Sequence, residues 1–93
     1  MDLEFEWDED KDIINQMKHG VSFDEATEVF YDPNRLELYD WEHSLSEDRW
    51  QAYGLVDCNV LTVVFTERGG IIRIISARNA DKEEEEEYFK WVW

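Results

Sequence analysis

The sequence predicts an α+β fold in which helices cover one face of a mainly antiparallel sheet. Apolar residues at helical spacing are confined to the two ends of the chain, and alternating or β-branched segments follow one another in the middle. Short turns join those middle segments, which favours antiparallel neighbours. Strands grouped apart from helices are typical of α+β layering, and the expected order is β-α-α-β-β-β-β-α.

The first half of the chain supplies one strand and two helices. Leu3 to Trp7 alternates between apolar and acidic residues, as in a half-buried strand. Asp8 and Gly20 are placed to begin and end a helix whose apolar face carries Ile13, Ile14 and Met17. Ser22 and Glu25 form a capping box for a second helix, which Asp32-Pro33-Asn34 ends. Its expected inner face is Phe23, Ala26, Val29 and Phe30.

The second half supplies four strands and a last helix. The strands are expected at residues 36–41, 49–56, 60–66 and 71–77, with turns at residues 57–59 and 69–70 and a polar connection at residues 43–48. The chain becomes helical again from about Asp81, where acidic residues crowd the first turns. Residues 1–93 show no repeat or linker, so we expect a single domain.

The composition of the chain argues against a membrane protein, a secreted protein and a disulfide-linked protein. No apolar run approaches the roughly 20 residues that cross a bilayer, and the acidic N-terminus is unlike a signal peptide. Cys58 is the only cysteine, so an internal disulfide and a cysteine-based metal site are both excluded. These observations predict a cytoplasmic protein without a membrane association, metal or cofactor.

The net charge of −15 is distributed unevenly. Residues 1–48 carry −13 and residues 79–93 carry −4, whereas residues 49–78 carry +2. The basic residues of that middle segment are all arginines: Arg49, Arg68, Arg73 and Arg78. Arginine binds phosphate through two parallel N–H groups, so these side chains are candidate phosphate ligands. The alternative is that they balance charge on a solvated sheet.

The four arginines suit one reaction in particular, the cleavage of RNA by attack of its own 2′-hydroxyl. That reaction needs no metal, only a held phosphate, stabilised negative charge and proton transfer. Lys18 and His19 are candidate proton carriers, although both also suit the negative end of a helix. His43 is a further candidate proton carrier, unless it is only a polar surface residue. Glu67 is a candidate base, unless it pairs with a neighbouring arginine.

An ordered series of short segments points to a family. The segments are Phe5–Asp8, Lys11, Asn15, Lys18–Phe23, Glu25-Ala26, Asp32-Pro33, Glu42–Ser44, Glu47, Arg49-Trp50, Gly54, Val63–Arg68 and Arg73–Arg78. No single segment is diagnostic, but the series resembles the BrnT family of toxins from about residue 5 to residue 80.

The resemblance implies a RelE-like fold and a bacterial type II toxin that degrades RNA. It implies a ribbon-helix-helix antitoxin, BrnA-like, that binds the toxin in a hetero-oligomer. The family's catalytic positions would fall on Lys18, His19, Arg49 and Arg78, and its substrate-binding positions on Arg68 and Arg73.

The last helix departs from the family pattern. Family members carry basic residues ahead of a tyrosine there, whereas this chain has Glu83–Glu87 before Tyr88. Five carboxylates near the site would repel RNA. Two alternatives therefore accompany the ribonuclease: a non-catalytic module that keeps antitoxin binding, and an acidic decoy that competes with nucleic acid for a basic protein.

Overall fold

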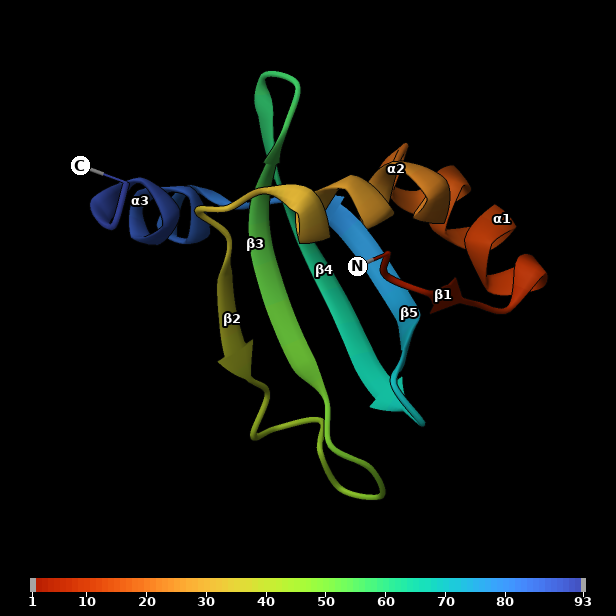
Figure 1. Ribbon diagram of the computed structural model, residues 1–93. Helices are drawn as coiled ribbons and strands as arrows, with labels where there is room; N and C mark the ends of the chain where they lie inside the picture. Colours follow the sequence, from red (N-terminus) through yellow and green to blue (C-terminus); the bar gives the residue numbers. More distant parts are fainter. Residues whose placement is uncertain (1, 93) are drawn as a thin grey trace.

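The computed structural model describes residues 2–92 as a five-stranded sheet flanked by helices (Figure 1). The elements are β1 (Phe5–Glu6), α1 (Glu9–His19), α2 (Phe23–Thr27), the 3-10 helix η1 (Glu28–Tyr31), β2 (Leu36–Tyr39), β3 (Trp50–Val56), β4 (Asn59–Arg68), β5 (Ile71–Asn79) and α3 (Lys82–Lys90). The strand order is β1-β5-β4-β3-β2. Strands β2 to β5 pair antiparallel and β1 pairs parallel with β5, so the α+β class and the mainly antiparallel sheet are confirmed.

The predicted capping residues begin and end the first two helices. The Asp8 carboxylate accepts from the backbone N–H groups of Asp10 and Lys11, and Gly20 ends α1 with a φ of 68°. Ser22 and Glu25 form the expected capping box at α2. The second helix is α-helical only to Thr27 and tightens into η1 before Asp32.

The hydrophobic core lies between one face of the sheet and the segment from Val21 to Phe30. The expected inner residues of α2 and η1 are all buried: Phe23, Ala26, Val29 and Phe30. They pack against the strand residues Ala52, Val63, Phe65, Ile72, Ile74 and Ala77. Gly54 lets the helical layer approach closely, because a Cβ there would lie 2.6 Å from Cγ1 of Val29. This packing fixes which face of the sheet is turned away from α2 and η1.

The helix α1 forms as expected, but its apolar face is not the face that packs on the sheet. Ile13, Ile14 and Met17 are 55%, 55% and 82% exposed, and the buried residue of α1 is Asn15. The reason is that α1 lies along β5 and is fastened there by polar contacts. The Asn15 side chain accepts from Ala77 N–H (3.1 Å) and donates to the carbonyls of Ala77 (2.7 Å) and Val21 (2.9 Å).

The strand β5 carries one extra residue relative to β4. Val64 pairs with Ser76 but the next residue, Phe65, pairs with Ile74, so Ile75 is bulged out of the ladder. Strict alternation would place Arg73 and Arg78 on opposite faces of the sheet. The bulge shifts the alternation of side chains along β5 by one residue, so Arg73 and Arg78 lie on the same face. Arg73 pairs with Thr66 and Arg78 with Thr62.

The ends of the strands differ from the predicted ones by a few residues. The strand β2 stops at Tyr39 rather than residue 41, because Asp40 turns the chain by accepting from the His43 backbone and side chain. The strands β4 and β5 extend to Arg68 and Asn79, two residues further than predicted. Within residues 2–92, no helix has the length and apolar character that crossing a membrane requires.

We expect Asn15→Leu to lower the free energy of unfolding by about 2–4 kcal/mol, because it leaves the Ala77 N–H and two carbonyls buried without partners. Urea denaturation would measure the change. Gln16→Leu, on the exposed side of the same helix, is the matched control and should change stability little. Equal stabilities of the two variants would contradict the role given to Asn15.

Candidate functional site

The sheet face turned away from α2 and η1, here called the open face, carries most of the predicted site residues. Register places the following residues on it: Gln51, Tyr53, Thr62, Val64, Thr66, Arg73, Ser76 and Arg78. The helix α3 packs across one end of this face, where Tyr88 is buried against Tyr53 and Val60. The other end is formed by Thr66, Arg73 and the residues just before β3.

Three of the four sheet arginines gather at that second end, around Glu47. Arg68 donates to the Glu47 carboxylate at 2.8 Å, and Arg49 lies 3.8 Å from its other oxygen. Arg73 lies 3.7 Å from Glu6 on the neighbouring strand. The hydrogen bond from Arg68, together with the charges of Arg49 and Arg73, holds the pKa of Glu47 below its usual value. We call Arg49, Arg68 and Arg73 the arginine cluster.

Two members of the arginine cluster, Arg49 and Arg73, make no side-chain hydrogen bond with the residues that the structure describes. The contacts of Arg49 and Arg73 with carboxylates, at 3.8 and 3.7 Å, are ion pairs too long for hydrogen bonds. Nε of Arg49 is buried and finds no acceptor among residues 2–92. A buried N–H without a partner is unfavourable, and an anionic oxygen placed against it would be bound well.

Arg78 is in a different situation at the α3 end of the face. Glu84 binds it through both oxygens, at 2.6 and 2.8 Å, and also accepts from the Thr62 hydroxyl at 3.0 Å. Along β4, Thr62 and Thr66 are four residues apart, so Arg78 lies about 13 Å from the level of Arg73. The structure therefore does not bring all four arginines together.

The surroundings of Arg78 are acidic. A shallow cavity beside Tyr53 is lined by Asp81, Glu83, Glu84 and Glu87. Burial and the negative charge of Glu84 together raise the pKa of Tyr53. Burial alone would raise the pKa of Glu84, but hydrogen bonds from Arg78 and the Asp81 backbone outweigh burial and hold that pKa below its ordinary value. Two terminal carboxylate oxygens thus occupy the guanidinium face that a phosphate would use.

The turn after β2 forms an aspartate–histidine pair beside the arginine cluster. Asp40 is 7% exposed and contacts Nδ1 of His43 at 3.0 Å, and Nε2 of that imidazole makes no hydrogen bond with residues 2–92. Asp40 also accepts from Gln51 on the open face, and its backbone N–H donates to the Arg49 carbonyl. Burial opposes the charge of Asp40, but the hydrogen bonds from Gln51 and His43 hold its pKa below the usual value. The role of Asp40 was missed in the sequence, where the Asp-x-x-His spacing was the available signal.

Lys18 and His19 lie at the margin of the sheet. They line a small cavity of about 180 Å³ with Ile75 and Ser76, where the bulge of β5 meets the last turn of α1. Both side chains belong to exposed residues. Lys18 and His19 lie beside β5, whereas His43 lies in the turn after β2, so the two histidines belong to opposite sides of the sheet's strand order.

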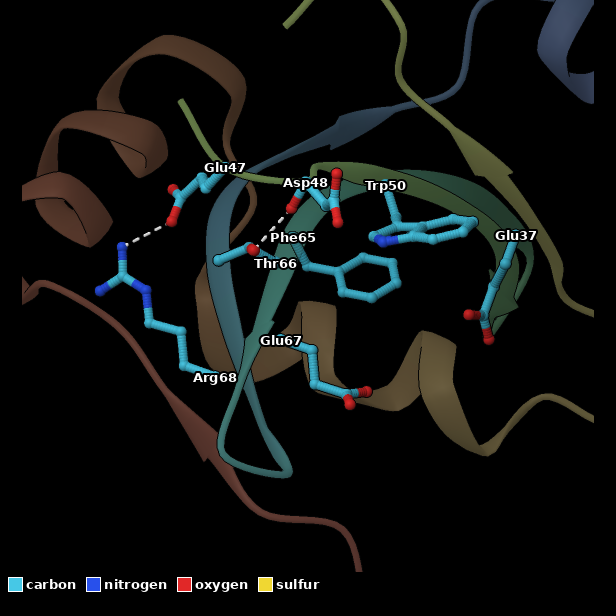
Figure 2. A pocket seen from close by; sticks show the side chains of 8 residues that line it. All are labelled: Glu37, Glu47, Asp48, Trp50, Phe65, Thr66, Glu67 and Arg68. Atoms are coloured by element: carbon cyan, nitrogen blue, oxygen red, sulfur yellow. Dashed lines mark hydrogen bonds and ion pairs between the residues drawn. The ribbon is translucent and has the colours of Figure 1, made fainter. Parts of the chain in front are cut away.

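Glu67 does not lie with the arginine cluster. It points to the opposite face and lines a cavity of about 530 Å³ (Figure 2). The walls of this cavity are Glu37, Glu47, Asp48, Trp50, Phe65, Thr66, Glu67 and Arg68. Among residues 2–92, no group of three or more histidine, cysteine or acidic side chains is arranged to hold a metal ion.

Comparison with known proteins identifies a family for most of the chain. Residues 7–84 match a family model described as the ribonuclease toxin BrnT of type II toxin–antitoxin systems. A search of curated proteins returned no significant match. The matched range contains every residue of the arginine cluster, the Asp40–His43 pair and the Arg78–Glu84 pair.

The Arg78–Glu84 pair predicts a stability difference that depends on pH. Because the pKa of folded Glu84 lies below its ordinary value of 4.5, its contribution is present above that value and is lost as the pH falls through the lower folded pKa. We expect wild-type protein to lose more free energy of unfolding than Glu84→Gln between about pH 5 and pH 3. Urea titrations at each pH would measure this.

Glu85→Gln, on the exposed side of α3, is the control and should follow the wild-type curve. Parallel curves for wild type and Glu84→Gln would show that the pair does not stabilise the fold.

Proposed function

This chain belongs to the BrnT family of ribonuclease toxins of type II toxin–antitoxin systems, and on that premise we propose that it cleaves RNA at the arginine cluster without a metal ion. A type II toxin acts together with an antitoxin partner. The observation that carries the proposal is the free donor set of Arg49, whose buried Nε lacks an acceptor among residues 2–92. A phosphate oxygen supplies the acceptor that this group lacks.

The arginine cluster suits the charge of a scissile phosphate. Three guanidinium groups face two carboxylates there, so the site keeps a positive charge in an otherwise acidic chain. The ion pairs with Glu47 and Glu6 lie in partly exposed positions, where such pairs contribute little stability. RNA phosphate can therefore replace those carboxylates at Arg49 and Arg73 without breaking a hydrogen bond of the guanidinium groups.

In the proposed reaction the 2′-hydroxyl attacks the adjacent phosphorus and the bond from phosphorus to the 5′-oxygen breaks. Arg49 and Arg73 hold the non-bridging oxygens and stabilise the charge that grows on them. His43, oriented by Asp40, exchanges protons through its free Nε2. Lys18 and His19 contact the RNA backbone at the edge of β5, beside Ser76.

The proposal includes the partner and the place of action. We infer a ribbon-helix-helix antitoxin that forms a hetero-oligomer with the toxin in the cytoplasm, where the RNA substrate is found. Arg78 does not bind the phosphate while Glu84 occupies it, so RNA binding is restricted to the part of the open face away from α3.

A second candidate is a non-catalytic module that binds the antitoxin but no longer cleaves RNA. The Arg78–Glu84 pair favours it, because a residue at a family catalytic position is bound by a carboxylate and surrounded by acidic side chains. Absence of cleavage by the wild type, with cleavage by Glu84→Gln, would support this candidate and identify Glu84 as the cause.

Purified chain incubated with RNA in EDTA tests the leading proposal. We expect Arg49→Ala and Arg73→Ala each to slow cleavage about 100-fold or more, because each removes donors from the developing oxyanion. Arg35→Ala is the matched control, since Arg35 also pairs with a carboxylate, Glu37, but lies outside the cluster. Equal cleavage by wild type and Arg49→Ala, or a requirement for Mg²⁺, would reject the proposal.

The two histidines are distinguished by their pH profiles. We expect His43→Gln to lower kcat about 100-fold or more and to remove one limb of the pH–rate profile, because it removes a proton carrier. His19→Gln should raise KM and leave the shape of that profile unchanged. The reverse pattern would assign proton transfer to His19 and limit His43 to the turn that it forms with Asp40.

A further inference from the structure

The helical layer covers only part of its sheet face, and the uncovered part is aromatic and acidic. Phe30 of η1 packs on Phe65 with ring centres 4.9 Å apart. This contact marks the end of the part of the sheet that α2 and η1 cover. Beyond it the same face continues with Trp50, Tyr39 and Trp41. We call the surface of Tyr39, Trp41, Trp50 and Phe65 the aromatic shelf. Figure 1 shows that α2 and η1 cross the sheet away from the ends of β2 and β4 where the aromatic shelf lies.

The aromatic shelf is ordered, and its two tryptophans are open to solvent, whereas Phe65 is buried at its inner edge. The ring of Tyr39 packs edge-to-face against Trp41 and Trp50, at 4.6 and 5.1 Å. Its hydroxyl donates to Asp48 at 2.8 Å, which fixes the ring in place. Nevertheless Trp41 is 82% exposed and Trp50 is 36% exposed. Aromatic residues held rigid and exposed in this way are typical of surfaces that bind another protein.

Carboxylates surround this surface. The cavity beside Trp50 and Phe65 is lined by Glu37, Glu47, Asp48 and Glu67, with Arg68 as its cationic group (Figure 2). Arg68 is already paired with Glu47. The side chain of Glu67 makes no hydrogen bond or ion pair with any other residue between 2 and 92, and this exposed side chain lies near Phe65 (Figure 2).

We infer that the aromatic shelf is the docking surface for a basic, amphipathic segment of the antitoxin, with an arginine or lysine of that segment seated between Trp50 and Glu67. Aromatic faces beside carboxylates attract such cations through both ion pairing and cation–π contact. RNA is disfavoured as the occupant because Asp48 and Glu67 pair with no arginine among residues 2–92, and their negative charge repels phosphate. A second copy is disfavoured because this chain has a net charge of −15, so like charges would meet.

The inference goes beyond RNA cleavage and does not depend on it. An antitoxin can bind the aromatic shelf whether or not the chain is a ribonuclease, and the test below measures binding alone. The cavity beside the aromatic shelf is also lined by Glu47 and by Arg68 of the arginine cluster, so a segment docked here lies next to the proposed RNA site.

Calorimetric titration with the separately purified cognate antitoxin tests the inference through two matched pairs of exposed residues. Trp41→Ala and Glu67→Lys should each weaken binding about 30-fold or more. Their controls, Trp91→Ala just after α3 and Glu86→Lys on α3, make the same chemical changes at exposed positions and should change affinity by less than about threefold. The circular dichroism of each variant should match that of wild type, since none of the four residues is buried.

A ¹⁵N-labelled sample gives an independent measurement. The indole N–H signals of Trp41 and Trp50 should shift on addition of antitoxin, whereas that of Trp91 should not. Unchanged affinity in both shelf variants would overturn the inference. So would loss of binding in Met17→Ala, which would place the antitoxin on the exposed side of α1, or dimerisation of the chain alone that Trp41→Ala abolishes.

Discussion

The extra residue in β5 is the constraint on which the arrangement of the open face depends. Ile75 is left out of the ladder, so the strand changes phase between Arg73 and Arg78 while β4 alternates without interruption. Ile72, Ile74 and Ala77 can therefore all contribute to the core, although strict alternation would not place them on one face. The same shift brings both arginines to the open face. It also puts Ser76 beside α1, where Lys18 and His19 reach the edge of the sheet.

The two ends of the open face have opposite electrostatic characters. At one end α3 closes over Arg78, and Glu84 binds it with good bidentate geometry in a partly buried position. At the other end Arg49 and Arg73 are held near carboxylates but make no hydrogen bonds with them. A carboxylate and a phosphate compete for the same donors of a guanidinium, so the first end resists anions and the second accepts them. An acidic chain can therefore keep one local site for a polyanion. The attraction between phosphate and guanidinium groups a few ångströms away is stronger than the repulsion from distant carboxylates, which salt screens.

The sheet also separates two kinds of surface onto its two faces. Donors for anions lie on the open face, whereas the aromatic shelf and Glu67 lie on the other face, where the helical cover stops at Phe65. The ion pair of Glu47 and Arg68 lines the cavity beside the shelf and also belongs to the arginine cluster's surroundings, so the two surfaces meet there. The cover stops there because α2 is short: it tightens into η1 after Thr27 and Asp32 then turns the chain toward β2. Asp32 fixes this path by accepting from the Leu55 backbone and the Tyr88 hydroxyl. Burial and that hydrogen bond raise the pKa of Tyr88 to about 12, so the tyrosine remains a donor at neutral pH.

Local spacing and composition were sufficient to predict the fold class, the caps at Asp8, Gly20 and Ser22, and the buried face of α2. The resemblance of an ordered series of segments was sufficient to indicate the family. Tertiary structure decided the rest. Helical periodicity places the apolar residues of α1 on one face, but they are exposed in the structure, where three hydrogen bonds of the Asn15 side chain hold another face of the helix against Ala77 and Val21. Segment charge suggested one set of four arginines, but the length of β4 separates Arg78 from the other three and Glu84 binds it. Contacts between residues distant in sequence are set by register and helix placement, and neither can be read from spacing along the chain.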